Sequence, residues 1–143
     1  MKISVITGAS SGMGRDFVTM IDKIEDCEEI WVIARRAERL AEIKSATGKR
    51  IVPIELDLSR EESFETYAKL LEDADADVVA LVNAAGFGKF GNFEDIPLKE
   101  QMNMIDLNCK ALMAVTYITL EYMKEGSRVY QLGSLSSFQP VPY

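Results

Sequence analysis

The 143-residue sequence contains no histidine, and this absence excludes several kinds of site at once. Without an imidazole, the chain alone cannot build a Ser-His-Asp triad, a Cys-His pair or a histidine-ligated metal centre. Its two cysteines, Cys27 and Cys109, lie far apart and form no paired-ligand motif. We therefore expect buried, reduced thiols rather than a disulfide, and no metal site.

Basic residues and long apolar runs are also scarce. Sixteen Lys and Arg against 23 Asp and Glu give a net charge of −7, which argues against binding to nucleic acid or to an anionic membrane. No run approaches the roughly 18 apolar residues of a membrane helix, and the first residues lack the apolar region of a secretory signal. The composition predicts a cytoplasmic protein without nucleic-acid or membrane partners.

Short apolar runs alternate with helical patterns along the chain. Residues 3–7, 30–34, 51–56, 78–82 and 129–132 are predicted strands. Predicted helices begin near Met13, at Ala37 with Gly48 closing the second helix, and after Ser59, which with Glu62 fits a capping box. A longer helix, with a break in its first third, is predicted from Leu98 to Lys124.

This alternation favours an α/β fold with a doubly wound parallel sheet in the strand order 3-2-1-4-5, incomplete at its C-terminal side. Pro53 cannot donate to a ladder, so the third strand is placed at an edge. The length suits one domain over residues 1–143. Ligands of such folds bind at the switch point between strands one and four.

The segment Thr7-Gly8-Ala9-Ser10-Ser11-Gly12-Met13-Gly14 lies at that switch point, between a predicted strand and a predicted helix. Glycine lets backbone amides approach a pyrophosphate, and a helix N-terminus adds positive potential. Taken alone, the glycines are also compatible with simple turn chemistry. As a dinucleotide-binding turn, the segment nominates Gly8, Ser10, Ser11, Gly12, Met13 and Gly14 as cofactor ligands.

Two arginines, Arg35 and Arg36, follow Ala34 at the end of the second predicted strand. An acidic residue there would bind the ribose 2′-hydroxyl of NAD, whereas arginine accommodates the 2′-phosphate of NADP. The pair therefore predicts NADP as the cofactor, with NAD less favoured. A solvated pair at a helix start is the alternative.

In the residues described so far, the chain resembles the N-terminal part of a short-chain dehydrogenase/reductase. Its first turn matches that family's Thr-Gly-x-x-x-Gly-x-Gly signature. The other matching positions are Asp57-Leu58 as the adenine contact, Asn83-Ala84-Ala85-Gly86 as the motif after strand four, Asn108 as the catalytic-site asparagine, and Ser134 as the catalytic serine. Singly, Asp57 could cap a turn, Asn83 could be a turn residue, and Asn108 could pair with a backbone carbonyl.

The resemblance implies an oxidoreductase that moves hydride between NADP and a small carbonyl or alcohol substrate. The family's chemistry also needs a Tyr-x-x-x-Lys pair about a dozen residues after the serine, and these 143 residues contain none. Tyr143 lies only nine residues after Ser134, too near to match. We expect a truncated chain that binds cofactor but is inactive alone. A non-catalytic dinucleotide-binding or partner-binding module is the alternative.

The long predicted helix is apolar over more than one stripe. We expect part of this surface to pack against a partner subunit or a further segment, so a homo-oligomer formed through the helix is predicted. The apolar positions are Leu107, Ala111, Leu112, Val115, Ile118 and Tyr122.

Overall fold

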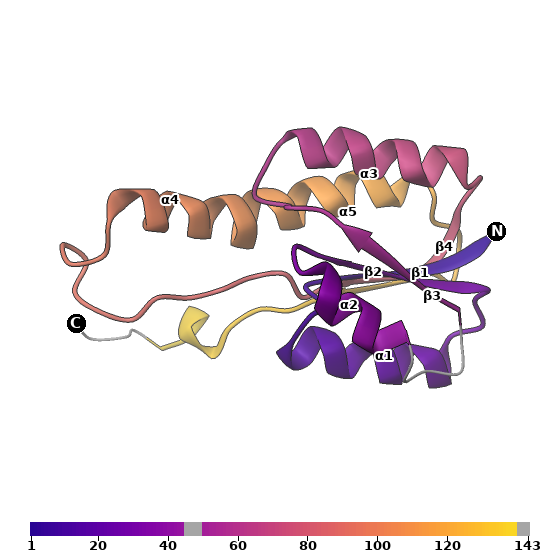
Figure 1. Ribbon diagram of the computed structural model, residues 1–143, viewed down its shortest axis with the longest axis horizontal. Coiled ribbons are helices and arrows are strands. Elements are labelled where there is room, and N and C mark those ends of the chain that lie inside the picture. Colours follow the sequence, from indigo (N-terminus) through magenta and orange to yellow (C-terminus); the bar gives the residue numbers. More distant parts are fainter. Residues whose placement is uncertain (45–49, 140–143) are drawn as a thin grey trace.

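A computed structural model describes residues 1–44 and 50–139 (Figure 1). Its centre is a parallel five-stranded sheet in the order β3-β2-β1-β4-β5, which confirms the predicted doubly wound topology. Pro53 lies in β3, at the edge where its missing N–H leaves no gap in the ladder. The strands are β1 (Lys2–Thr7), β2 (Glu29–Ala34), β3 (Arg50–Glu55), β4 (Asp77–Asn83) and β5 (Arg128–Gln131).

Helices cover both faces of the sheet, α1 (Gly12–Ile24) and α2 (Ala37–Lys44) on one face and α3 (Glu62–Asp73) and α5 (Leu112–Leu120) on the other (Figure 1). Successive strand residues point to opposite faces, so each strand supplies both cores. In β1, Val5 packs in the core beneath α3 and α5, and Ile6 packs in the core beneath α1 and α2. Apolar residues at consecutive strand positions are thus explained by burial on both sides.

The long helical region starts with α4 (Leu98–Ile105), passes through a π-helical segment, Asp106–Ala111, and continues as α5. The break predicted in the first third is therefore a change of helical pitch and not an interruption, and it begins only at Asp106, where that third ends. The last α-helical residue is Leu120, four residues before the predicted end. Together with the loop after β4 and the segment after β5, α4 projects beyond the carboxyl ends of the strands (Figure 1).

The predicted capping box at the start of α3 is wrong. The helix begins at Glu62, the residue before it is Glu61, and no side chain caps that end. The Ser59 hydroxyl instead donates to the carboxylate of Asp57, 2.7 Å away. A hydrogen bond to a preceding aspartate thus replaces the expected bond to the helix N-terminus.

The thiol prediction holds only in part. No disulfide joins Cys27 and Cys109, and Cys27 is buried, but Cys109, in the π-helical segment, is exposed. The predicted stop at Gly48 and the comparison with Tyr143 lie outside the described residues. Among the helices of the described ranges, none is long and apolar enough to cross a membrane.

Candidate functional site

The turn between β1 and α1 is held by the strands on both of its sides. The backbone N–H of Gly8 donates to the carbonyl of Ile33 in β2 at 2.9 Å. On the other side, the hydroxyl of Thr7 accepts hydrogen bonds from the backbone N–H groups of Ala84 (3.2 Å) and Ala85 (3.1 Å), just after β4. The turn is therefore fixed at the point where β2, β1 and β4 end side by side.

Two glycines of this turn are required by backbone packing. Gly8 has φ +67°, and a Cβ on it would lie 2.6 Å from the carbonyl oxygen of Ala84. A Cβ on Gly14 would clash with the carbonyl oxygen of Gly8. By contrast, a Cβ on Gly12 would meet no atom within 4 Å, although its φ of +54° also favours glycine. At Gly12 the backbone therefore faces open space and no side chain covers it.

A cavity of about 280 Å³ opens over this turn, and we call it the turn cavity. Asn83 is the one predicted cofactor ligand that does not line it. Four further lining residues were not predicted from the sequence: Ile33, Ala34, Leu56 and Leu107. The signal that could have found them is adjacency, because Ile33 and Ala34 directly precede Arg35, Leu56 precedes Asp57, and Leu107 precedes Asn108. The predicted residues in its lining are Gly8, Ser10, Ser11, Gly12, Met13, Gly14, Arg35, Arg36, Asp57, Leu58, Ala84, Ala85 and Gly86.

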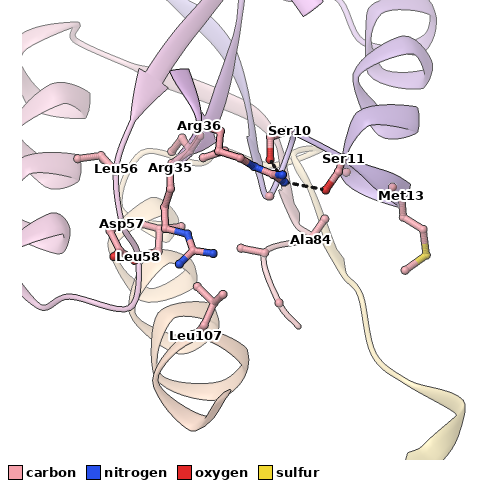
Figure 2. A pocket seen from close by; sticks show the side chains of 17 residues that line it. Ser10, Ser11, Met13, Arg35, Arg36, Leu56, Asp57, Leu58, Ala84 and Leu107 are labelled. Atoms are coloured by element: carbon pink, nitrogen blue, oxygen red, sulfur yellow. Dashed lines mark hydrogen bonds between the residues drawn. The ribbon is translucent and has the colours of Figure 1, made fainter. Parts of the chain in front are cut away.

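The two arginines point to different parts of the turn cavity (Figure 2). The Arg36 guanidinium lies over the glycine turn, with Nη2 3.1 Å from the hydroxyl of Ser10 and 3.4 Å from that of Ser11. Arg35 extends instead toward Asp57 (Figure 2). Among residues 1–44 and 50–139, no hydrogen bond or ion pair engages the Arg35 guanidinium, so its donors are available to a ligand.

Asp57 uses its carboxylate to shape the loop after β3. One carboxylate oxygen accepts both the backbone N–H of Ser59 at 3.1 Å and the Ser59 hydroxyl. The Asp57 backbone carbonyl accepts the Ser63 hydroxyl at 2.7 Å. Asp57 therefore caps a turn at the rim of the turn cavity, while its neighbour Leu58 is buried and packs in the core.

Asn83 directs its amide away from the turn cavity. The side chain is buried, and its Nδ2 donates to the hydroxyl of Thr116 in α5 at 2.9 Å. The same hydroxyl accepts a bond from Gln131 in β5 and donates to the carbonyl of Leu112. Asn83 thus joins β4 to α5 and supports the cavity only through the backbone that follows it.

Asn108 lies in the π-helical segment and pairs with both backbone groups of Phe87. Its Oδ1 accepts the N–H of Phe87 at 3.0 Å, and its Nδ2 donates to the carbonyl of Phe87 at 2.7 Å. A Cβ on Gly86 would lie 3.0 Å from Asn108 Oδ1, so the glycine allows this close approach. The side chain fixes the loop after β4 to the helix.

A second cavity, of about 580 Å³, contains both predicted catalytic residues, Asn108 and Ser134. We call it the loop cavity, because residues 87–96 form much of its wall. Phe87 and Asn108 line it, whereas their chain neighbours Gly86 and Leu107 line the turn cavity. The two cavities therefore adjoin along this pair of backbone segments.

Ser134 is exposed, three residues after the end of β5, and its hydroxyl oxygen accepts a hydrogen bond within the chain. Its oxygen accepts the backbone N–H of Ser136 at 3.1 Å, which caps the short 3₁₀ turn Leu135–Ser137. A serine hydroxyl also carries one proton that it can donate. The geometry thus orients Ser134 and leaves its proton available to an oxygen atom in the loop cavity.

A doubly wound parallel sheet with a glycine turn at its switch point defines the Rossmann-like class of α/β proteins. Within this class, the model of the short chain dehydrogenase family matches residues 2–143. The chain therefore belongs to the short-chain dehydrogenase/reductase family, which confirms the resemblance in its sequence motifs and makes it an oxidoreductase by resemblance.

Individual relatives extend beyond the length of this chain. An uncharacterised oxidoreductase of Staphylococcus epidermidis is 27% identical over 142 residues, which cover 98% of this chain and 61% of that protein. Sulfoacetaldehyde reductase 2 of Chromohalobacter salexigens is 31% identical over 98% of this chain and 57% of its own length. A short-chain dehydrogenase from Sphingobium yanoikuyae in complex with NADPH superposes with a TM-score of 0.82 at 24% identity, over 98% of this chain and 56% of the other. The chain spans about three fifths of the length of these relatives.

Proposed function

We propose that this chain is the NADP-binding part of an oxidoreductase that moves hydride between nicotinamide and a small carbonyl or alcohol substrate. The observation that carries the proposal is the convergence of Arg36, Ser10 and Ser11 in a cavity at the switch point of the sheet, with Arg35 in another part of the same cavity. These groups are cationic or hydroxylic, and the acidic residue of the described lining, Asp57, has a carboxylate oxygen bonded to Ser59. Such a set suits a ligand with several phosphate oxygens.

The glycine turn fits the pyrophosphate of a dinucleotide. Gly8 and Gly14 pack too closely for side chains, and at Gly12 an added side chain would occupy only open space. Helix α1 starts at Gly12 and carries no acidic residue in its first turn, so its N-terminal potential is not neutralised locally. Both features support a phosphate at this turn, where the family resemblance also requires one.

The arginines support NADP over NAD. Arg36 follows the carboxyl end of β2, where NAD-binding sites have an acidic residue, and together with the two serine hydroxyls of the turn after β1 it offers hydrogen-bond donors there. Arg35 adds a second guanidinium. We assign the remaining nominated ligands the same role, with Asp57 and Leu58 beside the adenine and residues 83–86 supporting the turn through their backbone.

We assign substrate binding to the loop cavity. Bound NADP supplies or accepts the hydride, and the cavity wall that Gly86 and Phe87 share with Asn108 is where its nicotinamide end would meet the substrate. The Ser134 hydroxyl donates a hydrogen bond to the substrate oxygen and so polarises the carbonyl, while its proton stays on the serine. Asn108 positions the Phe87 backbone. No residue in this chain has the tyrosine or lysine role at the spacing of the family motif.

Three wider assignments belong to the same proposal. The chain forms a single cofactor-binding domain, works in the cytoplasm on a small molecule, and associates with a second copy through its long helical region. The last assignment is supported by exposed apolar residues along α4 and α5, among them Met102, Met113 and Tyr117.

Calorimetric titration of the chain with NADPH and with NADH tests the cofactor assignment. A charge-assisted phosphate contact contributes about 1.5 to 3 kcal/mol, so NADPH should bind roughly 10- to 100-fold more tightly than NADH. Equal affinities, or tighter NADH binding, would contradict it. NADPH binding without hydride transfer, even when the chain is joined to the part of a relative that it does not match, would support a non-catalytic binding module instead.

A further inference from the structure

The wall of the loop cavity is largely apolar. Five of its residues, Phe87, Phe90, Phe93, Ile96 and Met104, present aromatic or aliphatic side chains beside Ser134. Phe90 and Phe93 are 81% and 80% exposed, which is unusual for two phenylalanines on one short loop. Their surface is available for burial by a ligand with an apolar body.

The loop that carries these phenylalanines is held in place by α4 and the π-helical segment. Asn108 pairs with both backbone groups of Phe87. Gln101 donates from Nε2 to the carbonyls of Phe93 and Ile96, each at 2.8 Å. Because the loop is anchored at both ends, the aromatic wall is part of the folded chain before any ligand arrives.

Lys89 is the one charged side chain in the described lining of this cavity. Its Nζ lies 3.3 Å from a carboxylate oxygen of Glu100, so its charge is balanced by a neighbour. An anionic substrate would need an uncompensated cation near its charged group. The loop cavity instead offers hydroxyl and amide groups near Ser134 and Asn108, and an apolar wall elsewhere.

We propose that the loop cavity selects an uncharged carbonyl compound or secondary alcohol whose body is aromatic or bulky and aliphatic. The inference rests on the proposed function, because it assumes that the reacting oxygen lies at Ser134. Phe90 and Phe93 bind the apolar body, and Glu100 disfavours anionic substrates by neutralising Lys89.

Saturation-transfer NMR with the NADPH-saturated chain tests this selectivity, with acetophenone as the apolar ketone and acetoacetate as the anionic ketone. We expect the unmodified chain to bind acetophenone. Phe90→Ala and Phe93→Ala should each lower the affinity by about tenfold, because each variant loses the apolar area that one phenyl ring buries against the ligand. Phe138→Ala is the matched control, since Phe138 is 87% exposed and lies outside the cavity lining. It should bind acetophenone as the unmodified chain does.

A second variant tests the charge argument. Glu100→Gln leaves Lys89 without its partner and should raise the affinity for acetoacetate severalfold while changing that for acetophenone little. Tighter acetoacetate than acetophenone binding by the unmodified chain would overturn the inference. Unchanged acetophenone affinity in both phenylalanine variants would also overturn it. If those variants changed the oligomeric state as well, the occupant of the loop cavity would be a second copy of the chain.

Cofactor binding is measured separately on the same samples, so that the two proposals can fail independently. Acetophenone binding that depends on Phe90 and Phe93, with no NADPH binding, would contradict the proposed function and leave the cavity's selectivity standing. NADPH binding with no preference for the apolar ketone would overturn the selectivity alone. Circular dichroism melts of each variant check that the fold is retained.

Discussion

Gly14, in the first turn of α1, packs directly on the backbone carbonyl of Gly8, so closely that the added Cβ of an alanine would clash with that oxygen. The Gly8 backbone cannot shift easily, because its N–H is bonded to the carbonyl of Ile33 in the neighbouring strand. The contact sets how near the start of α1 lies to the end of β1. It therefore determines the shape of the turn cavity.

Gly14→Ala should lower the free energy of unfolding by about 1 to 3 kcal/mol, the usual cost of forcing a methyl group into a packed site. It should also weaken NADPH binding, because the turn must open to relieve the clash. Urea denaturation and calorimetry measure the two effects. Gly88→Ala is the matched control, since a Cβ at Gly88 meets no atom within 4 Å. Equal stability of the two variants would contradict the packing argument.

The arginines give a second prediction. Arg35→Asp should weaken NADPH binding by roughly 10- to 100-fold and NADH binding much less, because a charge-assisted phosphate contact of about 1.5 to 3 kcal/mol is lost. Arg39→Asp makes the same charge change on α2, outside the turn cavity, and corrects for the altered net charge. Titrations in which Arg35→Asp weakens both cofactors equally would remove the basis for NADP preference.

A third prediction concerns Tyr67, a fully buried tyrosine that links α3 to α5. Its hydroxyl lies 2.8 Å from the hydroxyl of Thr119, which in turn donates to the carbonyl of Val115 at 2.6 Å. Tyr67→Phe should cost about 0.5 to 1.5 kcal/mol of the free energy of unfolding at pH 8. Tyr117→Phe, at a tyrosine 72% exposed on α5, is the control, and at concentrations too low for self-association it should change stability little.

The same residue predicts a pH dependence. Burial raises the pKa of Tyr67 well above its ordinary value, so unfolding is accompanied by loss of this proton once the pH exceeds about 10. The stability from the protonated group is present below that pH and declines as the pH rises, by up to about 1.4 kcal/mol per unit. Denaturation at pH 8 and at pH 10.5 should show a smaller decline in Tyr67→Phe. An identical decline in both proteins would refute the coupling.

Much of the fold could be predicted from the sequence because parallel strands buried on both faces must be apolar throughout. The run from Ile3 to Thr7 and the run from Val78 to Val82 lie within observed strands for this reason. Pro53 located the sheet edge by a single missing donor. The strand order followed from handedness and adjacency rules that do not depend on side-chain detail.

The details that the sequence pattern does not specify involve side chains with two available partners. The Ser59 hydroxyl could bond to a helix N-terminus or to Asp57, and in the structure it donates to the carboxylate of Asp57. Asn83 has the right type for a cavity residue, yet its amide bonds to Thr116 on the other side of the strand end. A one-dimensional pattern specifies neither choice, since each depends on which groups the folded chain brings within hydrogen-bond distance.

The long helical region shows a further difference. Leu107 and Ala111 of the π-helical segment and Val115 of α5 pack in the core, while a separate line of apolar residues stays outside. Sequence periodicity revealed excess apolar surface on this helix, but not which residues remain exposed. Those more than half exposed are Leu98, Met102, Ile105, Met113, Tyr117 and Leu120, and we call them the exposed stripe.

The exposed stripe gives the last prediction, which concerns assembly. Its residues recur three or four apart along α4 and α5, with exposed Cys109 completing the spacing, so they form one apolar line on the side away from the core. Two copies packed along this line would remove it from water.

We expect the chain to self-associate at high micromolar concentration. The double variant Met113→Lys with Tyr117→Lys should be monomeric, because association would bury the two lysines and bring like charges together. Met20→Lys, at a methionine 50% exposed on α1, should leave association unchanged. Size-exclusion chromatography with light scattering measures the masses, and a monodisperse monomer of the unmodified chain would defeat the prediction.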